Sequence, residues 1–208
     1  MTNPTQELIL AVQQANSDER LLESVRALAE CHSEAAIGTL ITVLGYNNPG
    51  AALAAVEGLI SLGESAVIPL VEQLDEYNYG ARAYSIRALA TIADPRALDV
   101  LVTAAAEDFA PSVRRAAAKG LGTLHWHQLQ PEEATDAQTK ALNTLIQVYK
   151  DSDWAIRYAA IVGLQALAKS ANSTTEPIQN LFEQRLSSEA DTAVRARILM
   201  AQKQLKSH

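Results

Sequence analysis

A short pattern that recurs five times constrains this chain more than any other feature. The five copies occupy residues 48–52, 78–82, 110–114, 153–157 and 191–195, and four of them end in Arg. Their starts differ by 30, 32, 43 and 38 residues. A repeat of roughly 30 to 45 residues is typical of solenoids, in which one supersecondary unit stacks on the next. The chain is therefore predicted to be a repeat protein.

Each copy has the pattern of a helix start. Its first residue is Asn or Asp in all copies but the third, and such side chains accept hydrogen bonds from the free N–H groups of a first turn. Apolar residues follow at i, i+3, i+4 and i+7, which places them on one helical face. The fifth copy has Gln202 where the others have Leu, as the degenerate end repeat of a solenoid often does.

A second apolar-periodic stretch precedes each copy, so each repeat is predicted to be a helical hairpin. These stretches cover residues 34–44, 65–74, 95–107, 135–149 and 175–187, and the polar stretches 125–134 and 170–174 are predicted to be loop insertions. Neither helix of a hairpin buries its apolar stripe alone, so the pairs must stack. The sequence predicts an all-α, HEAT-like, right-handed α-solenoid of about five hairpins with one concave surface.

The remaining N-terminal residues contain two amphipathic stretches, 5–15 and 17–30, which are predicted to cap that end of the solenoid. We therefore expect capping helices within 1–33 and repeats over 34–208. No linker rich in Pro, Gly or Ser divides the chain. A single domain over 1–208 is expected.

Composition excludes several classes of protein. Only 10 of 208 residues are aromatic, which favours helices over a β-sandwich. A net charge of −7 argues against general binding to nucleic acid phosphates. One Cys forms no internal disulfide, which fits a reducing, cytoplasmic location. The N-terminal residues resemble no signal peptide, and no run of about 18 apolar residues predicts insertion into a membrane.

Signatures of self-contained catalysis are absent from the sequence, which has no phosphate-binding Gly-rich loop, nucleophile elbow, His-Glu-x-x-His or Cys-x-x-Cys pattern. His125 and His127 supply at most half of a zinc site, so no metal is predicted, and Trp126 is expected to pack on the third repeat. Cys31 beside His32 is interpreted as a packed thiol at a helix end rather than as a nucleophile.

Projection of the second helices brings polar and aromatic residues to one face. Positions two and five after the Arg column point away from the Leu-bearing core, and the residues directly after the column include Arg115 and Tyr158. The helix entrances expose N–H donors. The residues gathered there include Tyr77, Tyr79, Tyr84, Arg87, Arg115, Lys119, Asp153, Trp154 and Tyr158. Aromatic planes beside guanidinium groups suit a flat conjugated ligand with carboxylates, or a partner surface with the same needs. The alternative is a structural role, in which the Asp and Arg columns form caps and inter-repeat ion pairs.

Four segments, 74–89, 94–98, 108–121 and 153–160, resemble the HEAT-like bilin lyases of the phycobilisome. The most specific strings are Tyr77-Asn-Tyr-Gly-Ala-Arg82 and Ser112-Val-Arg-Arg-Ala-Ala-Ala-Lys-Gly-Leu121, and the chain is most similar to F-type subunits of the heterodimeric phycocyanin alpha-subunit phycocyanobilin lyases. The resemblance implies work with a longer E-type partner to attach phycocyanobilin by a thioether to a cysteine of the phycocyanin alpha subunit. The nucleophile then belongs to the acceptor, and phycocyanobilin is a bound substrate, with no further cofactor.

The same resemblance assigns expected roles to the projected residues. Arg87, Arg115 and Lys119 are expected to bind the two propionates, and Asp153 is the candidate acid near the pyrrole nitrogens. The aromatic residues expected to contact the rings are Tyr77, Tyr79, Tyr84, Trp154 and Tyr158. Related lyases that isomerise the bilin carry a His-Cys pair, whereas this chain has the reverse order at Cys31-His32, which argues against isomerase activity.

Two other functions fit the same sequence. One is a non-enzymatic HEAT-repeat protein that binds phycobilisome proteins or bilins during antenna turnover. The other is a general HEAT scaffold whose concave surface grips a peptide or helix, with the aromatic and basic residues as interface hot spots.

Overall fold

A computed structural model describes residues 4–74 and 77–206, in which every regular element is an α-helix or a short 3-10 turn. The backbone divides into two compact units, Met1–Ile92 and Ala93–His208. The expectation of one domain over 1–208 stays a prediction.

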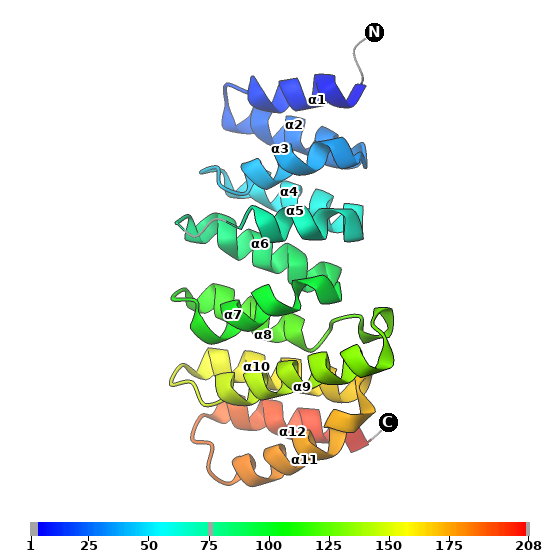
Figure 1. The fold of residues 1–208 in the computed structure, drawn as a ribbon. Helices are drawn as coiled ribbons and strands as arrows, with labels where there is room; N and C mark the ends of the chain where they lie inside the picture. Colours follow the sequence, from blue (N-terminus) through cyan, green and yellow to red (C-terminus); the bar gives the residue numbers. More distant parts are fainter. Residues whose placement is uncertain (1–3, 75–76, 207–208) are drawn as a thin grey trace. The chain divides into compact units, whose positions relative to one another are not determined.

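Unit 1 consists of an N-terminal helix pair followed by two hairpins (Figure 1). Its helices are α1 (Pro4–Gln13), α2 (Asp18–Glu30), α3 (Ile37–Val43), α4 (Pro49–Leu62), α5 (Val67–Glu72) and α6 (Tyr79–Ile92), with 3-10 turns at Glu34–Ala36 and Gly63–Ala66. Helices α2, α4 and α6 pack in succession as one layer, while α3 and α5 pack together in the other. Each second helix therefore contacts the second helix of the neighbouring repeat.

Unit 2 repeats this two-layer arrangement through three hairpins (Figure 1). Its helices are α7 (Leu98–Glu107), α8 (Pro111–Leu121), α9 (Pro131–Val148), α10 (Trp154–Ser170), α11 (Asn172–Leu186) and α12 (Thr192–Lys206), with 3-10 turns at Pro95–Ala97 and Trp126–Gln128. Helices α8, α10 and α12 form one layer, and α7, α9 and α11 form the other. The predicted HEAT-like solenoid with N-terminal capping helices is confirmed.

Both predicted loop insertions are wrong in part. Helix α9 begins at Pro131, so residues 131–134 are helical, and residues 126–128 form a 3-10 turn. Pro at the first helical position and acids in the first turn, here Glu132 and Glu133, favour a helix start. In the second stretch, Ser170 ends α10 and Asn172 begins α11, so the break between the helices is centred on Ala171.

The first residue of the repeated pattern caps its helix in the four copies that begin with Asn or Asp, as expected. The Asn48 side chain accepts from Ala51 N, and Asn78 accepts from Gly80 N and Ala81 N. Asp153 and Asp191 do the same at α10 and α12. Helix α8 begins without a side-chain cap at Ala110. The repeat therefore encodes its own helix starts in four of its five copies.

Ion pairs join the Arg column to the next repeat in unit 2. Arg114 Nη1 lies 2.7 Å from Asp151 Oδ2, and Arg157 Nη2 lies 2.8 Å from Glu189 Oε1. The acid stands two residues before the helix-capping Asp in each case. All four side chains are mostly buried, so these pairs are shielded from solvent screening. Arg195 of the last copy is exposed.

One apolar stretch, Pro49–Glu72, has the length and composition of a membrane-spanning helix. Gly63, with φ of +60°, ends α4 within it, and a 3-10 turn separates α4 from α5. Half of the stretch is buried inside the protein. The core helix of a soluble protein passes the same test.

Candidate functional site

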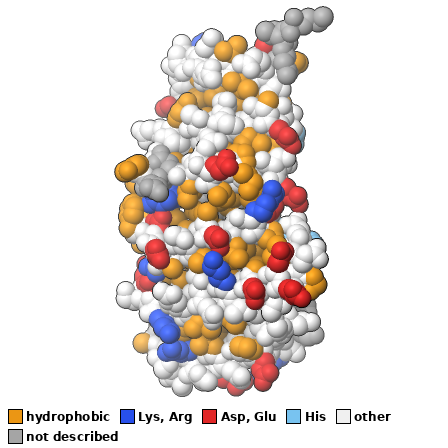
Figure 2. Space-filling view, viewed as in Figure 1, with side chains coloured by type: hydrophobic (Ala, Val, Ile, Leu, Met, Phe, Trp, Pro, Cys, Tyr) orange, Lys and Arg blue, Asp and Glu red, His pale blue; other side chains and the backbone are white. Residues whose placement is uncertain are grey.

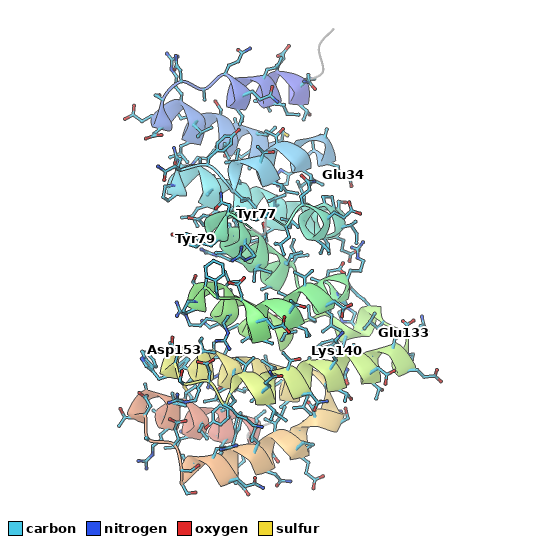
Figure 3. All side chains as sticks on the ribbon, turned by 60° about the vertical axis from the view of Figure 1, so that its left-hand side comes forward. Glu34, Tyr77, Tyr79, Glu133, Lys140 and Asp153 are labelled. Atoms are coloured by element: carbon cyan, nitrogen blue, oxygen red, sulfur yellow. The ribbon has the colours of Figure 1, made fainter. Side chains whose placement is uncertain are left out.

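Four of the predicted site residues lie at the start of α6 in unit 1. Tyr77 precedes the helix and is 96% exposed, and Tyr79 is its first residue and is 62% exposed (Figure 3). Tyr84 is half-buried, and Arg87 is exposed one turn further along the same face. No carboxylate among the described residues pairs with Arg87.

The other five predicted residues lie on α8, on α10 or at the N-terminal cap of α10, and these two helices pack against each other in unit 2. Arg115 and Lys119 are neighbours on α8 at spacing i, i+4, and neither pairs with a carboxylate in the part of the chain that the structure describes. Trp154 and Tyr158 have the same spacing on α10, where Trp154 is half-exposed. Since Arg115 and Tyr158 occupy equivalent repeat positions on packed helices, the structure combines basic and aromatic groups in this layer.

Asp153 has a capping role in this structure. Its Oδ1 accepts a 2.8 Å hydrogen bond from Ala155 N at the start of α10, and its own N–H donates to Asp151 Oδ1 (Figure 3). The carboxylate is half-buried. A capping carboxylate is held in one orientation by the helix end, which suits a positioned acid as well as a structural residue.

Arg197 on α12 is a residue that the sequence interpretation missed. It is 93% buried, being 7% exposed, and its Cζ lies 5.9 Å from the centre of the Tyr158 ring. Arg197 stands two positions after Arg195, the register that holds Tyr84 in the second repeat. The same register in the fifth copy of the pattern therefore predicts Arg197 as a site residue. The prediction covered only the second, third and fourth copies and so left Arg197 out.

Comparison with known proteins identifies the relatives of the chain. Residues 69–137 match the family model of HEAT repeats. A phycocyanobilin lyase subunit beta from Nostoc sp. (strain PCC 7120 / SAG 25.82 / UTEX 2576) is 58% identical over 96% of this chain and 100% of the relative. The chain belongs to the family of phycocyanobilin lyase beta subunits.

Other members of this lyase family agree in sequence and in structure. The phycocyanin alpha phycocyanobilin lyase CpcF of Synechocystis sp. (strain ATCC 27184 / PCC 6803 / Kazusa) is 49% identical over 96% of this chain and 93% of the relative. A chain in the solved complex of CpcE and CpcF of phycocyanin lyase from Nostoc sp. PCC7120 is 60% identical, with a TM-score of 0.79 over 82% of this chain and 99% of that chain.

The single cysteine of this lyase family member has a structural setting. Cys31 follows α2, is half-buried, and its Sγ donates to Leu28 O at 2.9 Å. His32 adopts φ of +48°, and its Nδ1 lies 2.7 Å from Glu30 O. The thiol therefore lies in a helix-terminal turn, in agreement with the interpretation of Cys31 as a packed residue.

The two histidines of the predicted loop approach each other, with ring centres 5.5 Å apart. Trp126 between them is buried, and its Nε1 donates to Ser170 Oγ on α10, so it contacts the fourth repeat. The described residues contain no cluster of three or more His, Cys, Asp and Glu side chains suited to a metal ion.

Charged side chains of both signs are interspersed with hydrophobic ones on the face of this lyase family member shown in Figure 2. Some exposed charges of the protein are paired, such as Lys140 and Asp99, whose Nζ and Oδ1 lie 2.7 Å apart. By contrast, Arg115 and Lys119 on α8 pair with no carboxylate among the residues that the structure describes. Unpaired cations in an acidic protein are the groups that an acidic ligand or partner would meet.

Proposed function

We propose that this chain is the beta subunit of a heterodimeric lyase that attaches phycocyanobilin to a cysteine of the phycocyanin alpha subunit. The observation that carries the proposal is the 58% identity to a phycocyanobilin lyase subunit beta over that relative's full length. The likeness in structure to a chain of the CpcE–CpcF complex supports an E-type partner. Phycocyanobilin is a bound substrate here, the protein has no further cofactor, and the complex works in the cytoplasm.

The reaction adds a thiol to a carbon–carbon double bond. The acceptor cysteine sulfur bonds to the ring A ethylidene, the thiol proton ends on the adjoining ring carbon, and no group leaves. The lyase therefore needs no nucleophile of its own. Cys31 is half-buried and its thiol donates to Leu28 O, which is consistent with a nucleophile supplied by the acceptor protein.

The lyase contributes binding and orientation. Arg115 and Lys119 are placed to bind propionates, and Tyr158 and Trp154 offer ring faces for the pyrroles. Unit 1 offers groups of the same chemistry on α6 and just before it, namely Tyr77, Tyr79, Tyr84 and Arg87. A bilin held extended presents one face of its ethylidene to the incoming thiol, and correct orientation alone supplies a large part of the rate enhancement.

Asp153 is the proposed acid. Its carboxyl group, fixed at the helix start, is assigned to the pyrrole nitrogens, where it would keep the conjugated system electron-poor. The N–H groups at the same helix end add positive potential to this region.

Co-expression tests the proposed function. The chain is produced with a phycocyanin alpha subunit and the enzymes that make phycocyanobilin, with and without an E-type subunit, and covalent bilin is detected by fluorescence after denaturing electrophoresis. We expect a fluorescent alpha subunit only when both lyase subunits are present. Equal fluorescence without this chain would overturn the proposal, and pigment binding without covalent product would favour the antenna-turnover alternative.

A further inference from the structure

Arg197 has an unused hydrogen-bond donor in the interior of unit 2. Nη1 is buried and has no acceptor in the structure as described, from residue 4 to 74 and from 77 to 206. Nη2 donates to Gln165 Oε1 on α10, and Gln165 Nε2 in turn donates to Gln204 Oε1 on α12. The second bond fixes the Gln165 amide with its oxygen toward the guanidinium.

No carboxylate among the described residues approaches Arg197. Burial lowers the pKa of its guanidinium, and the neighbouring Tyr158 is the one titratable group that acts in the other direction. Arg157, the mostly buried Arg of α10, by contrast donates to both carboxylate oxygens of Glu189. A buried charge without a counter-ion costs free energy, so the arrangement around Arg197 is incomplete.

Tyr158 lies next to this incomplete site. Its ring centre is 5.9 Å from the Arg197 Cζ, and the ring is half-buried while Arg197 is almost fully covered. Tyr158 and Gln165 are seven residues apart on α10, so they lie on one face of that helix. The Tyr158 ring, the Gln165 amide and the Arg197 guanidinium therefore form one cluster where α10 packs against α12.

We propose that Arg197 binds a propionate carboxylate of the bilin through Nη1, while Tyr158 turns to stack on the adjoining pyrrole. This inference rests on the proposed function and adds a specific binding residue to it. A propionate is a carboxylate on a flexible two-carbon arm, so its charge can reach a guanidinium that lies below the surface of the protein. The pyrrole that bears the arm supplies the flat surface that a tyrosine ring prefers.

Binding titrations on the heterodimer test the proposal. Wild type and Arg197→Met are each combined with the E-type subunit and titrated with phycocyanobilin and with its dimethyl ester, following the bilin absorbance. Arg195→Met is the matched control, because Arg195 is exposed on the same helix. We expect Arg197→Met to weaken binding of the free acid roughly tenfold to a hundredfold, the range for a charge-assisted hydrogen bond. The loss of affinity caused by esterification should shrink by the same factor in this variant only.

A second measurement separates binding from folding. The thermal midpoint of each full-length chain is measured alone and in the heterodimer. Because Met is apolar and nearly as long as Arg, Arg197→Met should fold and melt at or above the wild-type midpoint. A lower midpoint with an unchanged ester effect would assign Arg197 a structural role and overturn the proposal.

The partner subunit is the other source of a carboxylate. If Arg197 instead paired with an acid of the E-type subunit, Arg197→Met would weaken heterodimer assembly and leave the ester effect at its wild-type size. That result would overturn the proposal while leaving the lyase function intact. Absence of bilin transfer by the wild-type heterodimer would instead contradict the proposed function itself.

Discussion

Gly122, the residue directly after α8, and Gly163 on α10 hold the two helices in direct backbone contact. A Cβ built on Gly122 would lie 2.0 Å from Gly163 O, and one on Gly163 would lie 2.1 Å from Ala118 O. Real Cβ atoms essentially never approach backbone oxygens so closely. The contact sets the separation of the two helices that carry Arg115, Lys119 and Tyr158.

Gly163→Ala should destabilise the chain because its new methyl group meets backbone that cannot move alone. We expect a loss of at least about 2 kcal/mol in the free energy of unfolding, measured by urea denaturation. Gly38→Ala is the control, since nothing lies within 4 Å of a Cβ at Gly38 in α3. That variant should gain up to about 1 kcal/mol from helix propensity. Equal effects at the two positions would contradict the close contact.

Glu189→Gln should lower stability at neutral pH by about 3 kcal/mol, because it leaves the mostly buried Arg157 without its counter-ion. Burial acts to raise the pKa of Glu189, but hydrogen bonds from Arg157 and from Asp191 N outweigh it and hold the pKa below its ordinary value. A carboxyl with a lowered pKa stabilises the fold above its unfolded pKa, and this contribution is lost as pH falls through the folded pKa. Thermal midpoints of wild type and variant should therefore converge in acid. A gap independent of pH would contradict this assignment.

The Tyr149 phenol should lose its proton at a higher pH than an ordinary tyrosine does. Burial first, and then the charge of Glu189 and the hydrogen bond to it, raise its pKa to about 12. A raised pKa means that the stabilising contribution is complete below the ordinary pKa near 10 and is lost as pH rises toward the folded value. Tyrosinate absorbance of wild type minus that of Tyr149→Phe isolates this group. Titration near 10 in the folded protein would show that the ring is not buried against Glu189.

Asp153→Asn separates catalysis from capping. Asn caps a helix as well as Asp does, so the thermal midpoint should stay near the wild-type value, whereas Asp153→Ala should lose about 1 kcal/mol. If the carboxyl acts on the pyrrole nitrogens, Asp153→Asn should slow bilin transfer by roughly a hundredfold. The initial rate of covalent product formation by the heterodimer measures this. If the variant transfers bilin at the wild-type rate, Asp153 has only a helix-capping role.

Arg115→Ala and Lys119→Ala should weaken bilin binding without changing stability, because neither side chain pairs with a carboxylate among the described residues. We expect a rise of roughly tenfold in the KM for phycocyanobilin, with unchanged unfolding midpoints. Lys140→Ala is a suitable control, since Lys140 lies on α9 in the other layer and pairs with Asp99. The same rise in KM for the control would indicate a general effect of charge.

Local chemistry made most of the fold predictable. Asn48, Asn78, Asp153 and Asp191 are spaced as helix caps, and the apolar residues after them have the helical period, so the hairpins follow from residues near in sequence. The start of α9 was also encoded, by Pro131 and the two acids after it, but their polarity resembled a loop. These signals required no knowledge of the tertiary structure.

The site was less predictable because it depends on which helices meet. Repeat register places Arg115 and Tyr158 on neighbouring helices, and the structure has them there. No periodicity shows that Arg197 lacks a counter-ion, or that Gly122 faces Gly163, since both facts depend on the partner helix. Their roles in bilin binding stay predictions until the variants above are measured.

The Arg column of unit 2 gives the stack a direction. Arg114 pairs with Asp151 and Arg157 pairs with Glu189, so the Arg of one repeat forms an ion pair with an acid of the repeat that follows. A truncation that removes everything after α10 would leave the Arg157 guanidinium without Glu189. A truncation that removes everything before α9 would leave the Asp151 carboxylate without Arg114. The two ends of the stack are thus chemically unlike, and a chimera of such subunits should be spliced so that both members of each pair come from one parent.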